Sequence, residues 1–193
     1  MNVILTANGK GERMAKYEVP KHELLYKGRR ICDYALDTFS EAILATHHNT
    51  EWEGDKVTLP PPKSRRHTLK ELEYKGYKYD VLIIDCDIVF PKLEITKGMT
   101  RTNFLYYFKS ELHKYGSFLM QGDYLLFAKE KGYFENKTSG IYFIKRLDDI
   151  VRIMYEMQTD SILEAMSTMP TKCYLENNFI KLGDEQDYEK AIK

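Results

Sequence analysis

Cysteine is scarce in this sequence, and the few cysteines present do not indicate a disulfide framework or a metal site. Three occur in 193 residues, at positions 32, 86 and 173. An odd number at such wide spacing fits neither a disulfide-stapled fold nor a zinc cluster. We therefore expect a reducing, cytoplasmic environment.

Long apolar runs and an excess of one charge are also missing. No segment approaches the roughly 20 apolar residues of a membrane-spanning helix, and the chain does not open with a basic stretch followed by a long apolar one. Basic and acidic residues balance at 29 each, so no overall field attracts the protein to nucleic acid or to an anionic membrane. We expect neither as a partner, and any anion-binding site must be local.

What is present suits one folded domain. Hydrophobic residues make up 43% of the chain and aromatic residues 13%, which is ample for a core. Short apolar runs predict buried strands at 3–5, 42–46 and 81–84, with a weaker one at 57–59. Helical spacing predicts helices over 31–39 and 64–74, the second with the capping-box pattern Thr68-x-x-Glu71. Strands that alternate with helices indicate a parallel sheet, which binds ligands at the carboxyl ends of its strands.

The second half of the chain has less regular patterns. Helices are expected over 103–115 and 147–157, and strands over 124–128 and 140–144. A final helix over 184–192 is expected to begin at Asp184 as its N-cap.

The loop after the first strand carries a candidate phosphate site. Residues 9–21 read G-K-G-E-R-M-A-K-Y-E-V-P-K. Gly9 and Gly11 let backbone N–H groups approach an anion closely. Arg13 can bind phosphate oxygens through its planar fork, and Lys21, fixed by Pro20, adds a point charge.

Two better-known phosphate motifs do not fit this loop. The dinucleotide fingerprint requires a third glycine where Met14 stands, and no Gly-Lys-Ser/Thr follows at the spacing of a Walker A motif. The loop therefore argues against an NAD site and against a P-loop.

Two carboxylates form a second candidate site. Asp85 and Asp87 follow the apolar run V-L-I-I, and alternate residues on a strand share a face. Carboxylates at the mouth of a sheet suit Mg²⁺, which prefers a few carboxylate oxygens together with substrate phosphates.

The opening T-A-N-G-K-G-E-R-M with V-P-K resembles that of the nucleotidyltransferases that join a nucleoside triphosphate to a sugar phosphate or an alcohol phosphate. Residues 22–39 continue the likeness, and the closing L-G-D-E-Q-D-Y-E-K-A is similar to the family's last motif. The resemblance implies an α/β fold, a Rossmann-like three-layer αβα sandwich with a mostly parallel central sheet. It also implies a Mg²⁺-dependent enzyme that transfers a nucleoside monophosphate to a small phosphorylated acceptor and releases pyrophosphate, with a place in cell-surface polysaccharide synthesis.

The same resemblance implies roles for particular residues. Arg13 and Lys21 are the expected catalytic cations, and Asp87 the principal metal ligand, with Asp85 and Asp184 as further ligands. The nucleotide-binding residues are expected to be Ala7, Asn8, Gly9, Lys10 and Gly11. Residues 1–90 would form the nucleotide-binding half of a single domain spanning 1–193, and residues 91–193 the acceptor-binding half.

One departure from the family pattern stands near the end of the chain. Lys181 occupies the place where sugar-directed members carry a second metal-binding aspartate. Asp184 or Glu176 could stand in for it, or the lysine could replace the charge of one metal ion.

Other functions stay open from the sequence. Asp85-x-Asp87 is also the motif by which metal-dependent glycosyltransferases of related architecture hold a sugar nucleotide, and a nucleotide-binding relative without activity is a further alternative. The histidines show no metal-ligand spacing, and the adjacent His47 and His48 would diverge on a strand.

Overall fold

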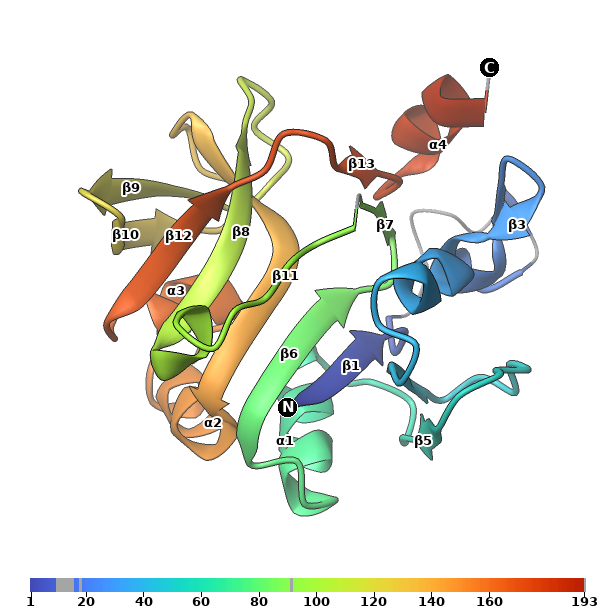
Figure 1. The fold of residues 1–193 in the computed structure, drawn as a ribbon, viewed down its shortest axis with the longest axis horizontal. Helices are drawn as coiled ribbons and strands as arrows, with labels where there is room; N and C mark the ends of the chain where they lie inside the picture. Colours follow the sequence, from blue (N-terminus) through green and yellow to red (C-terminus); the bar gives the residue numbers. More distant parts are fainter. Residues whose placement is uncertain (10–15, 18, 91, 193) are drawn as a thin grey trace. The chain divides into compact units, whose positions relative to one another are not determined.

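The computed structural model describes residues 1–9, 16–17, 19–90 and 92–192, which have a mixed α/β fold (Figure 1). The chain forms two compact units that interleave along the sequence. The first unit consists of Val3–Pro62, Ile84–Glu94 and Asn178–Lys193, and the second of Met1–Asn2, Lys63–Ile83 and Ile95–Asn177. The expected division into a nucleotide-binding half (1–90) and an acceptor-binding half (91–193) concerns ligands and stays a prediction.

The first unit contains a parallel sheet in the order β5–β4–β1 and two small antiparallel sheets. Its strands are β1 (Asn2–Thr6), β2 (Leu25–Tyr26), β3 (Arg29–Arg30), β4 (Ile43–Thr46), β5 (Lys56–Thr58), β7 (Ile88–Val89) and β13 (Ile180–Lys181). Its helices are the 3₁₀ helices η2 (Lys21–Glu23) and η3 (Ile31–Asp37) and the α-helix α4 (Glu185–Ile192).

Continuous apolar runs explain the parallel strands of this unit. Ile4 pairs with Ile43 and Leu5 with Leu44, and Ile4, Leu5 and Leu44 are at most 2% exposed. Strands covered on both faces need apolar residues at every position rather than at alternate ones. The strands expected at 3–5, 42–46 and 57–59 are thereby confirmed as β1, β4 and β5.

The segment between β1 and β4 differs in detail from the expected helix over 31–39. It forms a hairpin, β2–β3, and then the 3₁₀ helix η3. Lys27 and Gly28 both have positive φ (49° and 79°), as a two-residue turn of type I′ requires. In η3, Cys32 and Ala35 are buried, since residues three apart share one side of a 3₁₀ helix.

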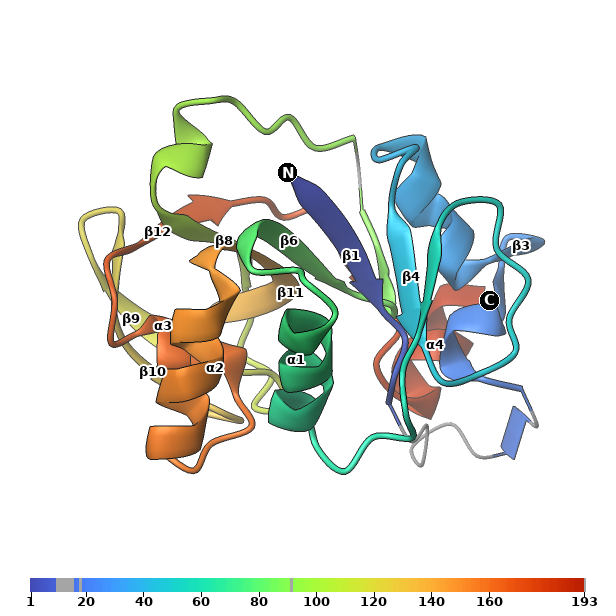
Figure 2. The same cartoon turned by 90° about the horizontal axis from the view of Figure 1, so that it is seen from below.

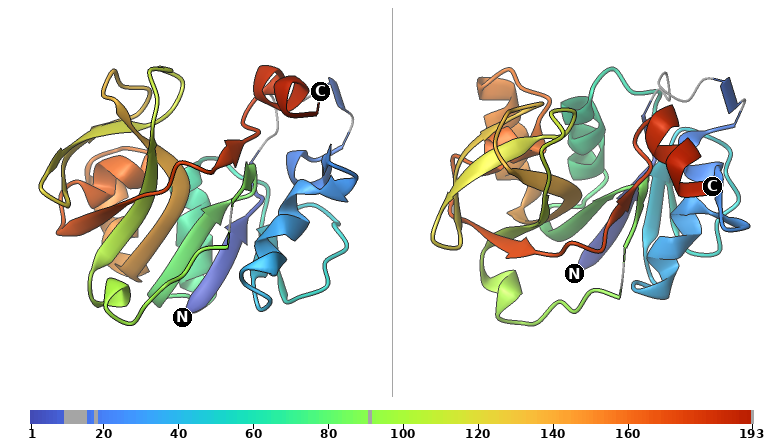
Figure 3. Two further views of the ribbon diagram at one scale, coloured as in Figure 1. Left: turned by 45° about the horizontal axis from the view of Figure 1, so that its top comes forward. Right: turned by 90° about the horizontal axis from the view of Figure 1, so that it is seen from above.

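The end of the chain is anchored in the first unit. Strand β13 pairs antiparallel with β7, and α4 follows it. Asp184 caps α4, as expected, because its Oδ1 accepts from the Asp187 N–H at 2.9 Å. Tyr188 donates to the Leu25 carbonyl at 2.7 Å, which places α4 beside the segment of β2, β3 and η3 (Figure 3). A hydrophobic cluster joins these elements: Leu24, Tyr26, Ile31, Val89, Leu182 and Tyr188.

The second unit contains a mixed sheet in the order β6–β11–β8–β12–β10–β9, with three α-helices on one face (Figure 2). Its strands are β6 (Tyr79–Asp85, in this unit up to Ile83), β8 (Asn103–Lys109), β9 (Ser117–Gln121), β10 (Tyr124–Lys129), β11 (Asn136–Arg146) and β12 (Thr171–Leu175). Its helices are α1 (Arg65–Tyr74), the 3₁₀ helix η4 (Met99–Arg101), α2 (Leu147–Glu156) and α3 (Ile162–Met166). No helix in the described ranges has the length and apolar character needed to span a membrane.

The expected helix over 103–115 is wrong. Residues 103–109 form β8, which pairs parallel with β12 and antiparallel with β11. Residues 103–107 are all buried, so the strand lacks the alternation by which strands are recognised. Likewise, Ser64 rather than Thr68 caps α1, with its Oγ accepting from the His67 N–H at 3.3 Å.

His22 is a buried titratable group of the first unit, 2% exposed. Its Nε2 lies 2.7 Å from the Thr50 hydroxyl, which itself donates to the Glu23 carboxylate. The hydroxyl hydrogen is therefore committed to Glu23, and the neutral imidazole donates from Nε2. Burial is the main reason that the pKa of His22 falls from 6.5 to about 4.

This burial predicts acid sensitivity. The unfolded chain takes up a proton on His22 below about pH 6.5, whereas the native chain resists it until about pH 4. Stability should therefore fall as the pH decreases between these values, by about 3 kcal/mol from this group. Urea unfolding at pH 7 and pH 4.5 tests this with His22→Gln, whose amide can still donate to Thr50. The decrease in unfolding free energy from pH 7 to pH 4.5 should be smaller in the variant than in the native protein. Equal decreases would contradict the prediction.

Candidate functional site

The residues of the candidate site lie within the first unit, where segments far apart in the sequence meet. Strand β7 pairs with β13, and the Leu182 N–H donates to the Asp87 carbonyl at 2.8 Å. This pairing brings Gly183, at the start of the last helix, beside the turn that carries Asp87. Figure 1 shows β13 beside β7 and continuing into α4.

An ion pair between Lys21 and Asp87 forms the centre of the site. The Lys21 Nζ donates to Asp87 Oδ2 at 2.5 Å and to the Gly183 carbonyl at 2.8 Å. The two side chains are only 14% and 15% exposed, so water screens them little. Lys21 opens the 3₁₀ helix η2 directly after Pro20, whose φ of −56° suits its fixed ring. Two of the expected site residues therefore contact each other directly.

Asp187 provides a second carboxylate at the site, which the sequence analysis did not select. A Cβ at Gly183 would lie 3.5 Å from Asp87 Oδ2 and 3.8 Å from Asp187 Oδ2. Asp187 belongs to the first turn of α4, and the capping bond from its N–H to Asp184 fixes that turn. The signal was available in the sequence, since Asp187 stands three residues after a capping aspartate.

The expected metal ligands have different positions. Asp85 is the last residue of β6, whereas Asp87 lies in the turn before β7, so the two do not share one strand face as expected. Asp184 uses Oδ1 to cap α4. Desolvation raises the pKa of the intervening Cys86 thiol to about 12, so this group is neutral at pH 7.

The end of β1 is fixed by its neighbours. The Ala7 N–H donates to the Ala45 carbonyl at 2.9 Å. Asn8 is 5% exposed; its Nδ2 donates to the Pro60 carbonyl at 3.3 Å, and its Oδ1 accepts from His47 Nδ1 at 2.7 Å. Gly9 is exposed, and no described atom lies within 4 Å of a Cβ built there. The expected residues Lys10, Gly11 and Arg13 lie outside the described part of the chain.

Three histidines of the first unit form a cluster that the sequence did not indicate. The ring centroids of His47 and His48 are 3.9 Å apart, and those of His22 and His48 are 5.5 Å apart. The two adjacent rings do not diverge as expected, because both residues follow β4 rather than belonging to it. Desolvation, then the charge of His48, lowers the pKa of His47.

The oxygen donors at Gly183 fit a hard cation shared with a phosphate ligand. The described residues contain no group of three His, Cys, Asp or Glu side chains placed to hold a metal ion. Mg²⁺ commonly takes only one or two protein carboxylates and completes its shell with water and substrate phosphates. Asp87 and Asp187 suit that pattern.

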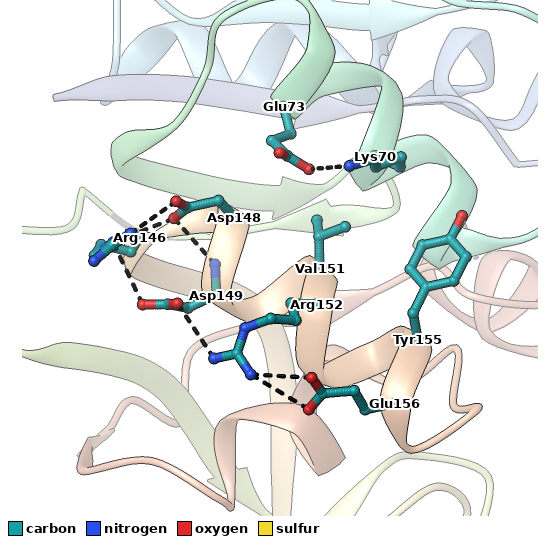
Figure 4. Close-up of a pocket in the computed structure, with 9 residues that line it drawn as sticks. All are labelled: Lys70, Glu73, Arg146, Asp148, Asp149, Val151, Arg152, Tyr155 and Glu156. Atoms are coloured by element: carbon teal, nitrogen blue, oxygen red, sulfur yellow. Dashed lines mark hydrogen bonds and ion pairs between the residues drawn. The ribbon is translucent and has the colours of Figure 1, made fainter.

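A separate groove lies in the second unit, between α1 and α2 (Figure 4). Its charged groups bond to one another: Lys70 with Glu73, Arg146 with Asp148 and Asp149, and Arg152 with Asp149 and Glu156. These exposed pairs form a solvated surface, and the groove contains none of the expected site residues.

Comparison with known proteins identifies the fold. No protein-family model matches the sequence, and no curated protein matches it. Solved structures do match over almost the whole chain. The CTP:phosphocholine cytidylyltransferase of Streptococcus pneumoniae aligns with a TM-score of 0.80 at 13% identity, covering 98% of this chain and 96% of that one. The nucleoside-diphosphate-sugar pyrophosphorylase of Vibrio cholerae RC9 aligns with a TM-score of 0.78 at 15% identity, covering 100% and 99%.

A UDP-glucose pyrophosphorylase solved with UDP-glucose is similar to the same extent, with a TM-score of 0.78 at 16% identity and coverage of 98% and 96%. The protein therefore has the fold of these nucleotidyltransferase structures.

The coupling between Lys21 and Asp87 can be measured in a double-mutant cycle. We expect Lys21→Met and Asp87→Asn each to destabilise the protein, because each breaks an ion pair between two largely buried side chains. The double variant should recover part of the loss, with a coupling energy of about 1–3 kcal/mol in urea unfolding. The exposed pair Arg152 and Glu156, whose side chains are 59% and 60% exposed, is the control and should couple by less than about 0.5 kcal/mol. Equal coupling in the two cycles would contradict the structure.

Proposed function

We propose that this protein is a nucleotidyltransferase that transfers a nucleoside monophosphate from a nucleoside triphosphate to a small phosphorylated acceptor. The observation that carries the proposal is the Lys21–Asp87 pair beside Gly183, in a chain whose fold matches nucleotidyltransferase structures end to end. The names of those proteins include both phosphocholine and sugar substrates, which supports an acceptor of that size. The Rossmann-like three-layer sandwich and a cytoplasmic enzyme in cell-surface polysaccharide synthesis belong to the same proposal.

The proposed reaction requires positioning and charge neutralisation. A phosphate oxygen of the acceptor attacks the α-phosphorus of the triphosphate, a P–O bond to that oxygen forms, and the bond to the β-phosphate breaks with release of pyrophosphate. Both reactants are anions, so the site must hold them against their repulsion. Mg²⁺, when bound, would supply positive charge at the phosphates. Asp87, Asp187 and, as further candidates, Asp85 and Asp184 are the groups proposed to hold it.

The remaining roles belong to the same proposal. Lys21 binds phosphate oxygens with its ammonium group, and Arg13 is proposed to do so with its guanidinium group. The main chain of Ala7, Asn8 and Gly9, with Lys10 and Gly11, is proposed to contact the nucleotide. Asn8 and His47 hold the end of β1 in place for that contact.

Pyrophosphate release tests the function directly. Purified protein with Mg²⁺ is incubated with each of ATP, GTP, CTP and UTP and with phosphocholine, phosphoethanolamine or glucose 1-phosphate. We expect release with one combination and a fall of roughly 100- to 1000-fold in kcat/KM for Lys21→Met and Asp87→Asn. Lys70→Met should retain full activity. Absence of release from every combination would refute the function, and hydrolysis of a sugar nucleotide would favour the glycosyltransferase alternative.

A substitution at Gly9 tests the role of the loop, and it distinguishes an effect on binding from an effect on folding. A methyl group there meets no described atom, and the structure gives Gly9 no positive φ. Gly9→Ala should therefore leave the thermal midpoint unchanged while weakening triphosphate binding, because a Cβ would stand between the main chain and the phosphates. Calorimetric titration with the active triphosphate measures this. Unchanged affinity would remove Gly9 from the proposed site.

A further inference from the structure

Lys21 and Asp87, which are proposed to bind different ligands, bind each other in this structure. Lys21 is assigned to phosphate and Asp87 to the metal ion, yet the Lys21 Nζ donates to Asp87 Oδ2 at 2.5 Å. The Gly183 carbonyl holds the same ammonium group at 2.8 Å. Each ligand of the proposed reaction must therefore take a group that is already engaged.

Either ligand alone would meet an unfavourable charge. A divalent cation that took Asp87 alone would leave the displaced Lys21 ammonium uncompensated beside it. A triphosphate that took Lys21 alone would leave Asp87, with Asp187 on the same side of Gly183, facing its negative oxygens. Both outcomes break an ion pair whose side chains are only 14% and 15% exposed, which is costly. A cation and a triphosphate that arrive together compensate both groups.

We propose that Lys21 blocks Asp87 against divalent cations in the nucleotide-free protein, so that the cation and the triphosphate bind interdependently. The inference rests on the proposed function, since that function assigns the two ligands. The exchange breaks one ion pair and forms two, one between Lys21 and phosphate and one between Asp87 and the cation. Because binding linkage is reciprocal, each ligand raises the affinity of the other by the same factor.

The decisive measurement is a titration with Mn²⁺ alone, followed by electron paramagnetic resonance on the full chain without nucleotide. Lys21→Met removes the competing ammonium, and we expect it to bind Mn²⁺ roughly 5- to 150-fold more tightly than the native protein. Adding Asp87→Asn should abolish the gain. Lys27→Met removes the same charge from a lysine that lies over the Tyr26 ring, and it should not change the affinity.

A second measurement uses only the native protein, in case Lys21→Met does not fold. Melting temperatures are compared with Mn²⁺ alone, with inorganic tripolyphosphate in chelator, and with both. A ligand that binds the native state raises the melting temperature, so we expect a clear rise only with both present.

The outcomes separate this inference from the proposed function. Equal Mn²⁺ affinity in the native protein and Lys21→Met, or full stabilisation by either ligand alone, overturns the inference while pyrophosphate release still supports the function. If pyrophosphate release fails with every substrate, the function fails, whereas tighter Mn²⁺ binding by Lys21→Met would still support the block at Asp87.

Discussion

The ion pair between Lys21 and Asp87 is the constraint on which the candidate site depends. It joins the 3₁₀ helix after Pro20 to the turn after β6, and the Gly183 carbonyl ties both to the start of α4. Three segments separated by about 60 to 160 positions are thereby fixed around one ammonium group. A lysine that is 14% exposed is well placed for this task, because a charge partly removed from water gains more from each partner than a solvated one. Such pairs contribute little net stability, so the arrangement is better explained by binding than by folding.

Anchoring and chemistry are carried by different residues of α4. The helix packs through Tyr188 into the cluster with Leu24 and Ile31, and Glu185 and Glu189 pair with Lys16. These last contacts are exposed and hence weak, so the apolar contacts provide most of the anchoring. The first turn begins at the cap Asp184 and also carries Asp187. A helix held in this way places the Asp187 carboxylate on the same side of Gly183 as that of Asp87.

Fold and site make independent contributions to the functional argument. The matching structures are only 13–16% identical to this chain in sequence, so they establish its fold alone. One fold can host many reactions. The chemistry must therefore come from the residues themselves. An amine and two carboxylates around one glycine suit a ligand that combines phosphate with a cation. The charged groove of the second unit lacks this property because its charges compensate one another.

The sequence by itself determined the elements whose signals are local. The runs at 3–5, 42–46 and 81–84, the helix over 147–157 and the Asp184 cap all depend on neighbouring residues, and the structure contains them. Only tertiary structure decided that 103–109 is a strand, since burial on both faces removes the periodicity that tells a strand from a helix. The sequence motifs also indicated Lys21 and Asp87 as site residues. The motifs did not predict that Asp187 lies near Gly183 beside them, because that position depends on the pairing of β13 with β7. That pairing joins residues about 90 positions apart, and no local preference in the chain specifies it.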